Sequence, residues 1–274
     1  MLGTVIVELY DGSTLRPQDE RIEALRPDPG RGVFETLLVV DGEPIELGLH
    51  MERLASSTGE LFGADAPAGA RELVREHARG LALGRLRLDV APDGDGRLAP
   101  SLRVAEVEPP LVFPSWERAA TIAGVVVPGG IGGHKWADRR LLDLAQSDCG
   151  MAVPLVLDAD GAVLEVSRGN VFLVRDGSLV TPPADGRLLP GVARRRLVEV
   201  AAAAGVEVRE REVPGDELAG ADEVFLTGSV RGVEPVRAYE GFREWEEGEL
   251  TPLLSAGLRR RWLGRLDRDY TRTP

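Results

Sequence analysis

Lys135 is the only lysine in this 274-residue chain, and arginine supplies the other 32 of the 33 Lys and Arg side chains. A guanidinium stays protonated and has no free lone pair, whereas a desolvated ε-amine can lose its proton and form a Schiff base with a carbonyl carbon. Lys135 is therefore the first candidate for carbonyl chemistry. A general preference for arginine over lysine would explain the count equally well, so the residues around Lys135 must decide between a catalytic role and a compositional bias.

The overall composition excludes other classes of function. A net charge of −12 argues against a nucleic-acid surface, because phosphate contact requires clustered positive charge. The arginines at the C-terminal end are expected to form a solvated helix face; they are Arg259, Arg260, Arg261 and Arg265. No apolar stretch approaches the roughly 18 residues of a membrane span, and the N-terminus lacks the basic region of a signal peptide. The single cysteine, Cys149, excludes an internal disulfide and is typical of a reducing, cytoplasmic compartment.

The elements that must position Lys135 fall into two halves. In the first half, alternating apolar residues predict strands and apolar residues at helical spacing predict helices. The strands are expected at 3–9, 33–40, 85–91 and 101–107, and the helices at 49–61 and 70–81. Asp41 and Gly42 predict a tight hairpin turn after the second strand.

Three prolines within residues 108–117 predict an extended connector and a domain boundary. We expect a small domain at 1–110, a connector at 111–120 and a larger domain at 121–274. The larger domain is expected to contain strands at 119–127, 152–158, 163–166, 171–175 and 221–229, and helices from Lys135 to 148 and at about 192–204. Gly191 would open the second helix and Gly205 would follow its end. The many antiparallel strands disfavour a doubly wound nucleotide fold, and neither GxGxxG nor GxxxxGK[ST] occurs.

Six sequence segments, in order, resemble the fold-type IV pyridoxal-phosphate enzymes, also called class IV aminotransferases. This family includes branched-chain aminotransferases, D-amino-acid aminotransferases and 4-amino-4-deoxychorismate lyases. The segments are GVFETLLV with Phe34 and Glu35, HMERL with His50 and Arg53, the Lys135 region, LEVSRGNVFLV (164–174), TPP (181–183) with LLPGVAR (188–194), and EVFLTGSVRGVEPV (223–236). The resemblance implies a two-domain α/β (α+β) fold, with a small N-terminal α/β domain and a larger C-terminal domain built on a mixed, barrel-like sheet.

The resemblance also implies the residues of a pyridoxal 5′-phosphate site. Lys135 would hold the cofactor as a Schiff base and then act as the base at the substrate's α-carbon. Glu165 would face the pyridine nitrogen and keep the ring protonated; without the resemblance it would be taken for a solvent-facing strand residue. The phosphate would be held by Arg53, by the amides at the start of a helix, and by a second turn. Those two backbone segments are Gly191, Val192 and Ala193, and Thr227, Gly228 and Ser229.

Several of these residues have simpler alternative explanations. Arg53 in isolation would be a surface helix arginine, and residues 227–229 a plain turn. The family often has a hydroxyl residue where Ala193 stands, so one phosphate contact is expected to be missing. Asn170, the only asparagine, is predicted to tie a strand to a loop. We expect no bound metal and no nucleic-acid or membrane partner.

The substrate is expected to be a small amino compound with a carboxylate. Arg139, four residues after Lys135, would share a helix face with it and meet that carboxylate; Arg87 is a second candidate on a strand of the small domain. The Lys-x-x-x-Arg spacing resembles the lyases, whereas branched-chain aminotransferases usually have a tyrosine where Arg140 stands. A basic solvent face remains an alternative for Arg139 and Arg140, and Trp136 departs from the lyase pattern.

We therefore rank 4-amino-4-deoxychorismate lyase first. It would release p-aminobenzoate and pyruvate in folate biosynthesis. An amino-acid aminotransferase of the D-amino-acid or branched-chain type comes second. A catalytically silent small-molecule-binding relative is a remote alternative, and a fold unrelated to pyridoxal enzymes would make all six matches coincidental. The resemblance further implies a homodimer.

Overall fold

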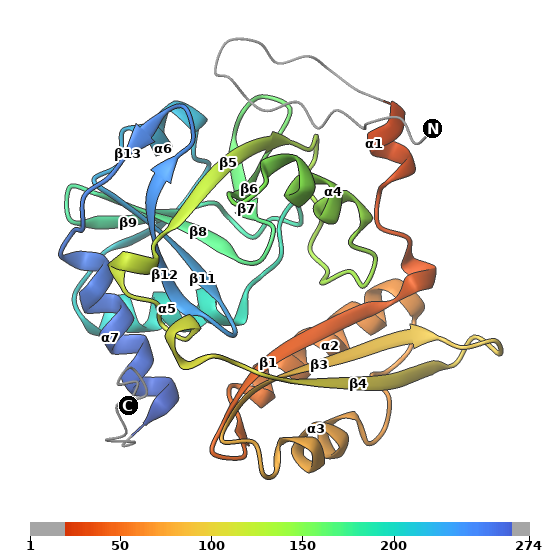
Figure 1. Cartoon of the computed structure of the whole chain (residues 1–274). Helices are drawn as coiled ribbons and strands as arrows, with labels where there is room; N and C mark the ends of the chain where they lie inside the picture. Colours follow the sequence, from red (N-terminus) through yellow and green to blue (C-terminus); the bar gives the residue numbers. More distant parts are fainter. Residues whose placement is uncertain (1–19, 265–274) are drawn as a thin grey trace.

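A computed structural model describes residues 20–264 of the chain (Figure 1). The strand predicted at 3–9 and Arg265 lie outside the described residues. The structure is a mixed α/β fold with two sheets, and this confirms the predicted fold class. The described part begins with the short helix α1 (Glu20–Ala24) and the 3-10 turn η1 (Pro29–Arg31).

The first sheet is antiparallel, and its four strands lie in the order β2-β1-β3-β4. They are β1 (Val33–Val40), β2 (Glu43–Pro44), β3 (Leu83–Pro92) and β4 (Leu98–Glu106). The predicted turn between β1 and β2 is confirmed, because Asp41 and Gly42 both have positive φ, 48° and 80°. The predicted helices are α2 (Leu47–Phe62) and α3 (Ala70–Ala78), and both cover one face of the sheet.

The period-2 geometry of β1 divides its side chains between two environments. Val33, Leu37 and Val39 pack in one cluster with residues of α2 and α3. Leu38 and Val40 belong instead to a cluster with residues of the second sheet and its helices. Both faces of β1 are therefore buried, and the first sheet presents its helix-free face to the second.

The second sheet has nine strands in the order β10-β9-β8-β11-β12-β5-β6-β7, with β13 paired to β12. Its strands are β5 (Ala120–Val126), β6 (Val153–Leu157), β7 (Val163–Val166), β8 (Asn170–Arg175), β9 (Ser178–Thr181), β10 (Val208–Glu210), β11 (Glu223–Gly228), β12 (Gly232–Tyr239) and β13 (Arg243–Glu244). The pairs β10/β9, β12/β5 and β5/β6 are parallel and the others antiparallel. This mixed pairing agrees with the expectation that the fold is not doubly wound.

Four helices accompany the second sheet: α4 (Arg140–Cys149), α5 (Val192–Ala203), α6 (Gly215–Ala219) and α7 (Leu250–Leu263). Helices α5 and α7 pack side by side against it (Figure 1). Helix α5 matches its prediction closely, because Gly191 is its N-cap and Gly205 follows its end with φ +75°. Arg260 and Arg261 on α7 are exposed, as expected.

The proline-rich connector contains two 3-10 turns, η2 (Pro109–Leu111) and η3 (Trp116–Arg118), between the sheets. Phe113 has a left-handed φ of 51°. Its ring packs so closely on Gly232 that a Cβ there would lie 2.2 Å from the ring. The connector is thus fastened to the start of β12, and a domain boundary within it remains a prediction.

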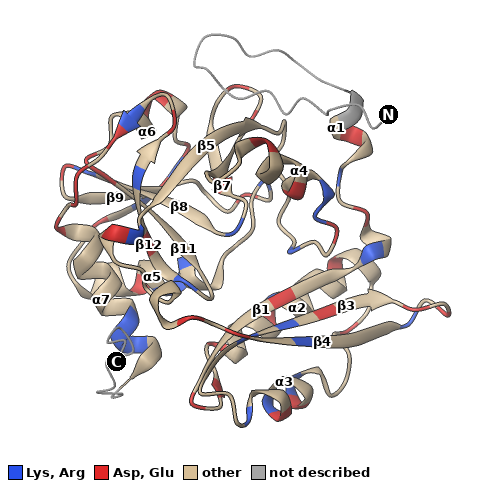
Figure 2. Ribbon diagram, in the orientation of Figure 1, with Lys and Arg blue, Asp and Glu red and all other residues tan. Residues whose placement is uncertain are grey.

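Figure 2 shows both basic and acidic residues along β3 and β4, whereas the one charged residue of β1 is acidic, Glu35. Within residues 20–264, no helix is long and apolar enough to cross a membrane. The same residues contain no group of three or more His, Cys, Asp or Glu side chains arranged to hold a metal ion.

Candidate active site

A cavity of about 640 Å³ lies between the two sheets, and Lys135 is part of its wall. The Lys135 amine lies 4.8 Å from the centre of the Phe34 ring. Burial, reinforced by the positive charge of Arg53, lowers the pKa of Lys135 to about 8. A substantial fraction of the amine is therefore neutral at mildly alkaline pH, as a nucleophile or base requires.

Lys135 is held by the first sheet and not by a helix. Its carbonyl oxygen accepts a hydrogen bond from the Phe34 amide at 2.8 Å, and the Ala137 amide donates to the Gly32 carbonyl at 3.0 Å. Trp136 forms a β-bridge with Val33. These contacts hold residues 135–137 in an extended conformation beside the start of β1.

The prediction that a helix begins at Lys135 is therefore wrong, because α4 begins at Arg140. The backbone of residues 135–137 pairs with residues 32–34 where β1 begins, and the Asp138 carboxylate then accepts the Arg140 amide at 3.3 Å. Arg139 does not share a helix face with Lys135. It nevertheless reaches the same cavity, where its Nη2 donates to the Ser167 carbonyl at 2.9 Å.

The two neighbours whose roles the sequence left open have structural partners. Arg140 is exposed and binds the Asp138 carboxylate through Nε and Nη2. The Trp136 indole donates to the Ile131 carbonyl at 2.9 Å and packs against the core of the first sheet. Neither lines the cavity.

Glu165 lies on β7 and is 7% exposed, so the alternative of a solvent-facing strand residue is wrong. Burial raises the pKa of Glu165 to about 8, and one backbone hydrogen bond, from the Leu189 amide at 3.3 Å, acts in the opposite direction. A buried carboxyl group with a raised pKa is stabilised in its charged form by a cationic or hydrogen-bonding partner. The positive charge of Lys135 also acts on the pKa of Glu165, so the two groups are close.

Arg53, on α2, connects the first sheet to the start of α5. Its guanidinium donates to the Glu35 carboxylate at 2.8 and 2.6 Å, and its Nη1 donates to the Pro190 carbonyl at 3.1 Å. Pro190 directly precedes Gly191, the N-cap of α5. Arg53 is thus almost entirely buried against a helix N-terminus and is not the surface arginine considered above.

The loop before α5 is tied to the second sheet by Asn170. The Asn170 amide donates to the Leu189 carbonyl at 2.9 Å, and this confirms its predicted structural role. Gly191 is required at this point, because a Cβ there would lie 2.0 Å from the Asn170 Oδ1. No side chain caps the first turn of α5, so the amides of Val192 and Ala193 remain suited to an anion.

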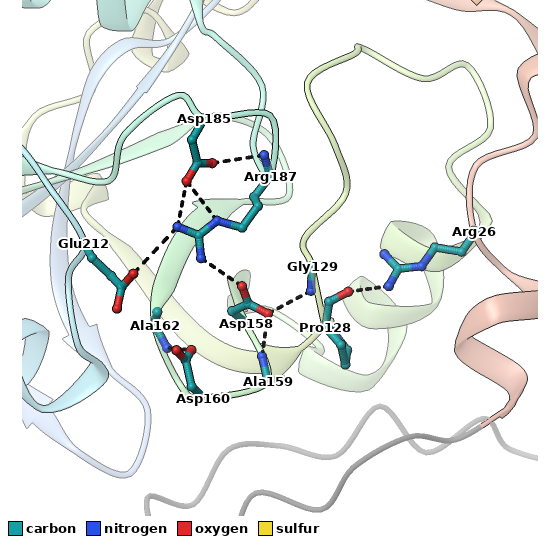
Figure 3. Close-up of polar contacts among 10 residues, drawn as sticks. All are labelled: Arg26, Pro128, Gly129, Asp158, Ala159, Asp160, Ala162, Asp185, Arg187 and Glu212. Carbon is teal, nitrogen blue, oxygen red and sulfur yellow. Dashed lines mark hydrogen bonds and ion pairs between the residues drawn. The ribbon is translucent and has the colours of Figure 1, made fainter.

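Arg187 fastens this loop to the glycine-rich segment that precedes Lys135 (Figure 3). Its guanidinium binds Asp185 at 2.7 Å and Asp158 at 3.0 Å, and Asp158 also accepts the Gly129 amide at 2.8 Å. The Arg187 carbonyl accepts the Gly132 amide at 3.1 Å. The lysine-bearing loop and the loop that leads to α5 are therefore held in one fixed arrangement.

The residues present fit pyridoxal phosphate. Thr227 is 2% exposed, and its hydroxyl has no hydrogen-bond partner among the described residues. Thr227 lines the same cavity as Lys135, together with Gly228 and Ser229. An unpaired buried hydroxyl, an uncapped helix N-terminus and a lysine with a lowered pKa are what a phosphorylated aldehyde requires.

The structure does not place all predicted site residues in the cavity wall. Lys135, Arg87, Arg139 and residues 227–229 line it, whereas Arg53, Glu165 and residues 191–193 do not. The charges of Arg53, Arg139 and Glu165 nevertheless all act on the pKa of Lys135, which places them near its amine.

Four further arginines line the cavity and were missed by the sequence interpretation: Arg85, Arg103, Arg168 and Arg231. Two of them could have been found. Arg85 and Arg87 share one face of β3 because strand side chains alternate, and Arg103 lies directly opposite Arg87 on β4. Arg87 stacks 3.6 Å from the centre of the Phe34 ring and pairs with Asp89 at 2.8 Å.

Residues 32–239 match the sequence profile of the family described as "Amino-transferase class IV", and the chain belongs to this family. The family is pyridoxal-phosphate-dependent, and one solved relative, a hypothetical aminotransferase from Mycobacterium tuberculosis, is described as a PLP-bound form (TM-score 0.74, 23% identity, 87% of this chain and 90% of that chain). The protein is therefore a pyridoxal-phosphate-dependent enzyme, and the alternative of an unrelated fold is excluded.

Named relatives carry two different activities. A putative branched-chain-amino-acid aminotransferase of Methanocaldococcus jannaschii is 28% identical over 82% of this chain and 85% of its own length. The branched-chain-amino-acid aminotransferase of Escherichia coli K12 is 34% identical, but the match spans only 48% of this chain and 42% of that protein. The 4-amino-4-deoxychorismate lyase of Pseudomonas aeruginosa has 30% identity and a TM-score of 0.73 and covers 94% of this chain and 98% of its own.

Proposed function

We propose that the protein is a 4-amino-4-deoxychorismate lyase that forms p-aminobenzoate and pyruvate in folate biosynthesis, as a cytoplasmic homodimer. The observation that carries the proposal is the cationic wall around Lys135, in which Arg87 and Arg139 line the same cavity as the amine. The substrate has one amino group and two carboxylates, which match guanidinium groups. The near end-to-end similarity to the Pseudomonas aeruginosa lyase supports this choice.

The proposed cofactor contacts use the groups described above. Arg53, the amides of Val192 and Ala193 and the Thr227 hydroxyl would hold the phosphate, with Gly191 allowing close approach and Gly228 and Ser229 completing the second turn. Glu165 would hold the ring nitrogen. When bound, the cofactor withdraws electrons from the carbon that bears the substrate's amino group.

The reaction then depends on one base and on substrate orientation. The Lys135 amine would take the proton from that ring carbon. Arg87 and Arg139 would hold a carboxylate and orient the ring. The carbon–oxygen bond to the enolpyruvyl group breaks, the ring becomes aromatic, and the released pyruvate enolate takes up one proton at its methylene carbon to give pyruvate. Atoms balance without an added oxidant or second substrate.

An amino-acid aminotransferase of the branched-chain or D-amino-acid type is the second candidate. The names of the Methanocaldococcus jannaschii and Escherichia coli relatives favour it. It would use the same lysine and the same cofactor contacts, and it would differ in releasing a keto acid while the amino group stays on the cofactor.

The deciding experiment supplies the holoenzyme with aminodeoxychorismate, generated in place from chorismate by a synthase without lyase activity. We expect p-aminobenzoate and pyruvate in equal amounts. Lys135→Ala should reduce the rate by about 10²–10⁴-fold, the usual contribution of a positioned base. Arg237→Gln, an exposed substitution on β12 outside the cavity, serves as the matched control.

In parallel, D-alanine, L-leucine and L-glutamate are added separately and the cofactor spectrum is followed. Rapid conversion to the pyridoxamine form without any p-aminobenzoate in the first assay would overturn the lyase proposal and support the aminotransferase.

A further inference from the structure

Two arginines in the cavity wall converge on one buried carboxylate. Arg168 donates to Glu234 through Nη2 at 2.7 Å and through Nε at 3.3 Å, and Arg231 donates through Nη1 at 3.1 Å. Glu234 is 3% exposed, whereas the Arg168 and Arg231 side chains are 36% and 30% exposed and line the cavity. The carboxylate therefore lies beneath the two guanidinium groups.

The charges of this cluster, Arg168, Arg231 and Glu234, do not balance. Glu234 is the only carboxylate that pairs with either arginine within residues 20–264. Two positive charges face one negative charge, and each guanidinium has N–H donors that Glu234 does not use. Burial, with Arg168 close by, lowers the pKa of Arg231, so an arriving anion would relieve repulsion there.

Backbone packing fixes both arginines in position. Arg168 lies in the turn before β8, where Gly169 packs so tightly on β11 that a Cβ would lie 2.1 Å from the Thr227 carbonyl. Arg231 lies in the turn between β11 and β12, and its carbonyl accepts the Phe113 amide of the connector at 2.9 Å. Both guanidinium groups thus belong to the same wall as the Thr227 hydroxyl.

A purely structural cluster would need only one of the two arginines. A single Arg168–Glu234 pair already links the turn before β8 to β12 and neutralises the buried carboxylate. Adding a second, half-buried guanidinium costs desolvation and like-charge repulsion unless an anion pairs with it. Arg87 and Arg139 pair with other carboxylates, Asp89 and Asp143, and among the described residues neither forms an ion pair with Glu234.

We propose that Arg168 and Arg231, held together by Glu234, form a second carboxylate subsite, so that the cavity selects amino substrates bearing two carboxylates. The inference rests on the proposed function in one respect, namely that Lys135 marks where the amino group reacts and that Arg87 and Arg139 take the first carboxylate. Aminodeoxychorismate and dicarboxylic amino acids such as glutamate share this chemistry.

The test compares the binding of glutarate and butyrate to the holoenzyme by calorimetry, in the wild type and in Arg168→Gln and Arg231→Gln. The wild type should bind glutarate about tenfold or more tightly than butyrate, the effect of one extra charge-assisted contact. Each variant should lose about tenfold in glutarate affinity and keep its butyrate affinity. Arg237→Gln, on the same strand as Glu234 but outside the cavity, should change neither.

Equal affinity of the wild type for the two acids would overturn the inference, and this measurement does not depend on any variant folding. The inference would also be overturned if both variants lost affinity for glutarate and for butyrate to the same extent, or if neither variant lost affinity for glutarate. A variant that keeps its butyrate affinity has an intact cavity. The variants Arg168→Lys and Arg231→Lys keep the positive charge and should therefore retain part of the glutarate affinity that the Gln variants lose.

The lyase assay separates this inference from the proposed function. Absence of p-aminobenzoate with loss of glutarate selectivity in the variants would refute the lyase and leave the subsite standing. Formation of p-aminobenzoate with an unchanged KM for aminodeoxychorismate in both variants would refute the subsite and leave the lyase standing.

Discussion

Two buried glutamates, one on each sheet, lie near Lys135, and their pKa values are shifted in opposite directions. Glu35, on β1, is 1% exposed and accepts hydrogen bonds from Arg53 and from His50 at 2.7 Å. Burial alone would raise its pKa, but Arg53 and His50 together lower it to about 2. Glu165, on β7, is similarly buried, but its one hydrogen-bond partner among the described residues is the Leu189 amide, and burial raises its pKa to about 8.

The difference shows that burial does not by itself decide the ionisation of a carboxyl group; the partners do. The Glu35 carboxylate already has hydrogen-bond partners within the protein, His50 and Arg53, and needs no ligand to stabilise its charge. Burial lowers the pKa of His50, so the neutral ring donates its Nδ1–H to Glu35, and the carboxylate holds Arg53 against the start of α5. Glu165 has spare acceptor capacity that a protonated pyridine nitrogen would use. Glu35 thus positions a predicted cofactor ligand, and Glu165 is predicted to be one.

The largest effect is expected from Glu35→Gln, which should lower the free energy of unfolding by about 3–5 kcal/mol at pH 7, because it leaves the buried Arg53 unpaired. The folded pKa of about 2 lies below the ordinary value of 4.5. The stabilisation is therefore present above pH 4.5 and lost as the pH falls toward 2, so the wild type and the variant should converge in acid. Urea unfolding at several pH values measures this.

The exposed Glu43→Gln on the neighbouring strand β2 is the control and should leave stability unchanged. A Glu35→Gln protein as stable as the wild type at pH 7 would show that the Glu35–Arg53 pair contributes no stability.

The next effect is expected from Glu165→Gln, which should lower kcat by about 10²–10³-fold, as is typical when one preorganised electrostatic contact is removed from an active site. In contrast to Glu35→Gln, it should not lower the stability of the apoprotein. Steady-state kinetics of the cofactor-loaded variant, with its absorption spectrum recorded, measure the effect. An unchanged kcat would remove Glu165 from the proposed site.

A third effect is expected in the pH dependence of apoprotein stability. The folded pKa of Glu165, about 8, lies above the ordinary value of 4.5, so the folded state binds more protons than the unfolded state between these values. Wild-type stability should therefore fall as the pH rises from 4.5 to 8, and that of Glu165→Gln should fall less. Between pH 5 and 8 the variant's melting temperature should rise by several degrees relative to the wild type, since each kcal/mol shifts it by about 2–4 °C. If the melting temperatures of the wild type and Glu165→Gln changed with pH in the same way, the raised pKa of Glu165 would be contradicted.

Several elements followed from local sequence patterns alone. Strand β1, the Asp41–Gly42 turn and helix α5 were predicted within a residue or two, because apolar periodicity and turn-forming residues act over short distances. The structural role of Asn170 was also predicted, and its amide does donate to the loop before α5.

The segment around Lys135 shows where such patterns fail. Residues 135–148 have helical spacing, but the helix begins only at Arg140 because residues 135–137 bond to β1, about a hundred positions earlier in the chain. No local pattern contains that partner. The clustering of Arg168 and Arg231 on Glu234 was missed for the same reason, because two separate turns of the second sheet bring these residues together.

The sequence by itself determined the single lysine, the positions of β1 and α5, and the family to which the chain belongs, because these depend on residue identity and short-range spacing. Only the tertiary structure decided that the pKa of Glu35 is lowered while that of Glu165 is raised, that Lys135 lies in an extended segment, and that six arginines of the described residues line one cavity. Ionisation and binding depend on which groups meet once water is removed, and that is set by contacts between residues far apart in the chain.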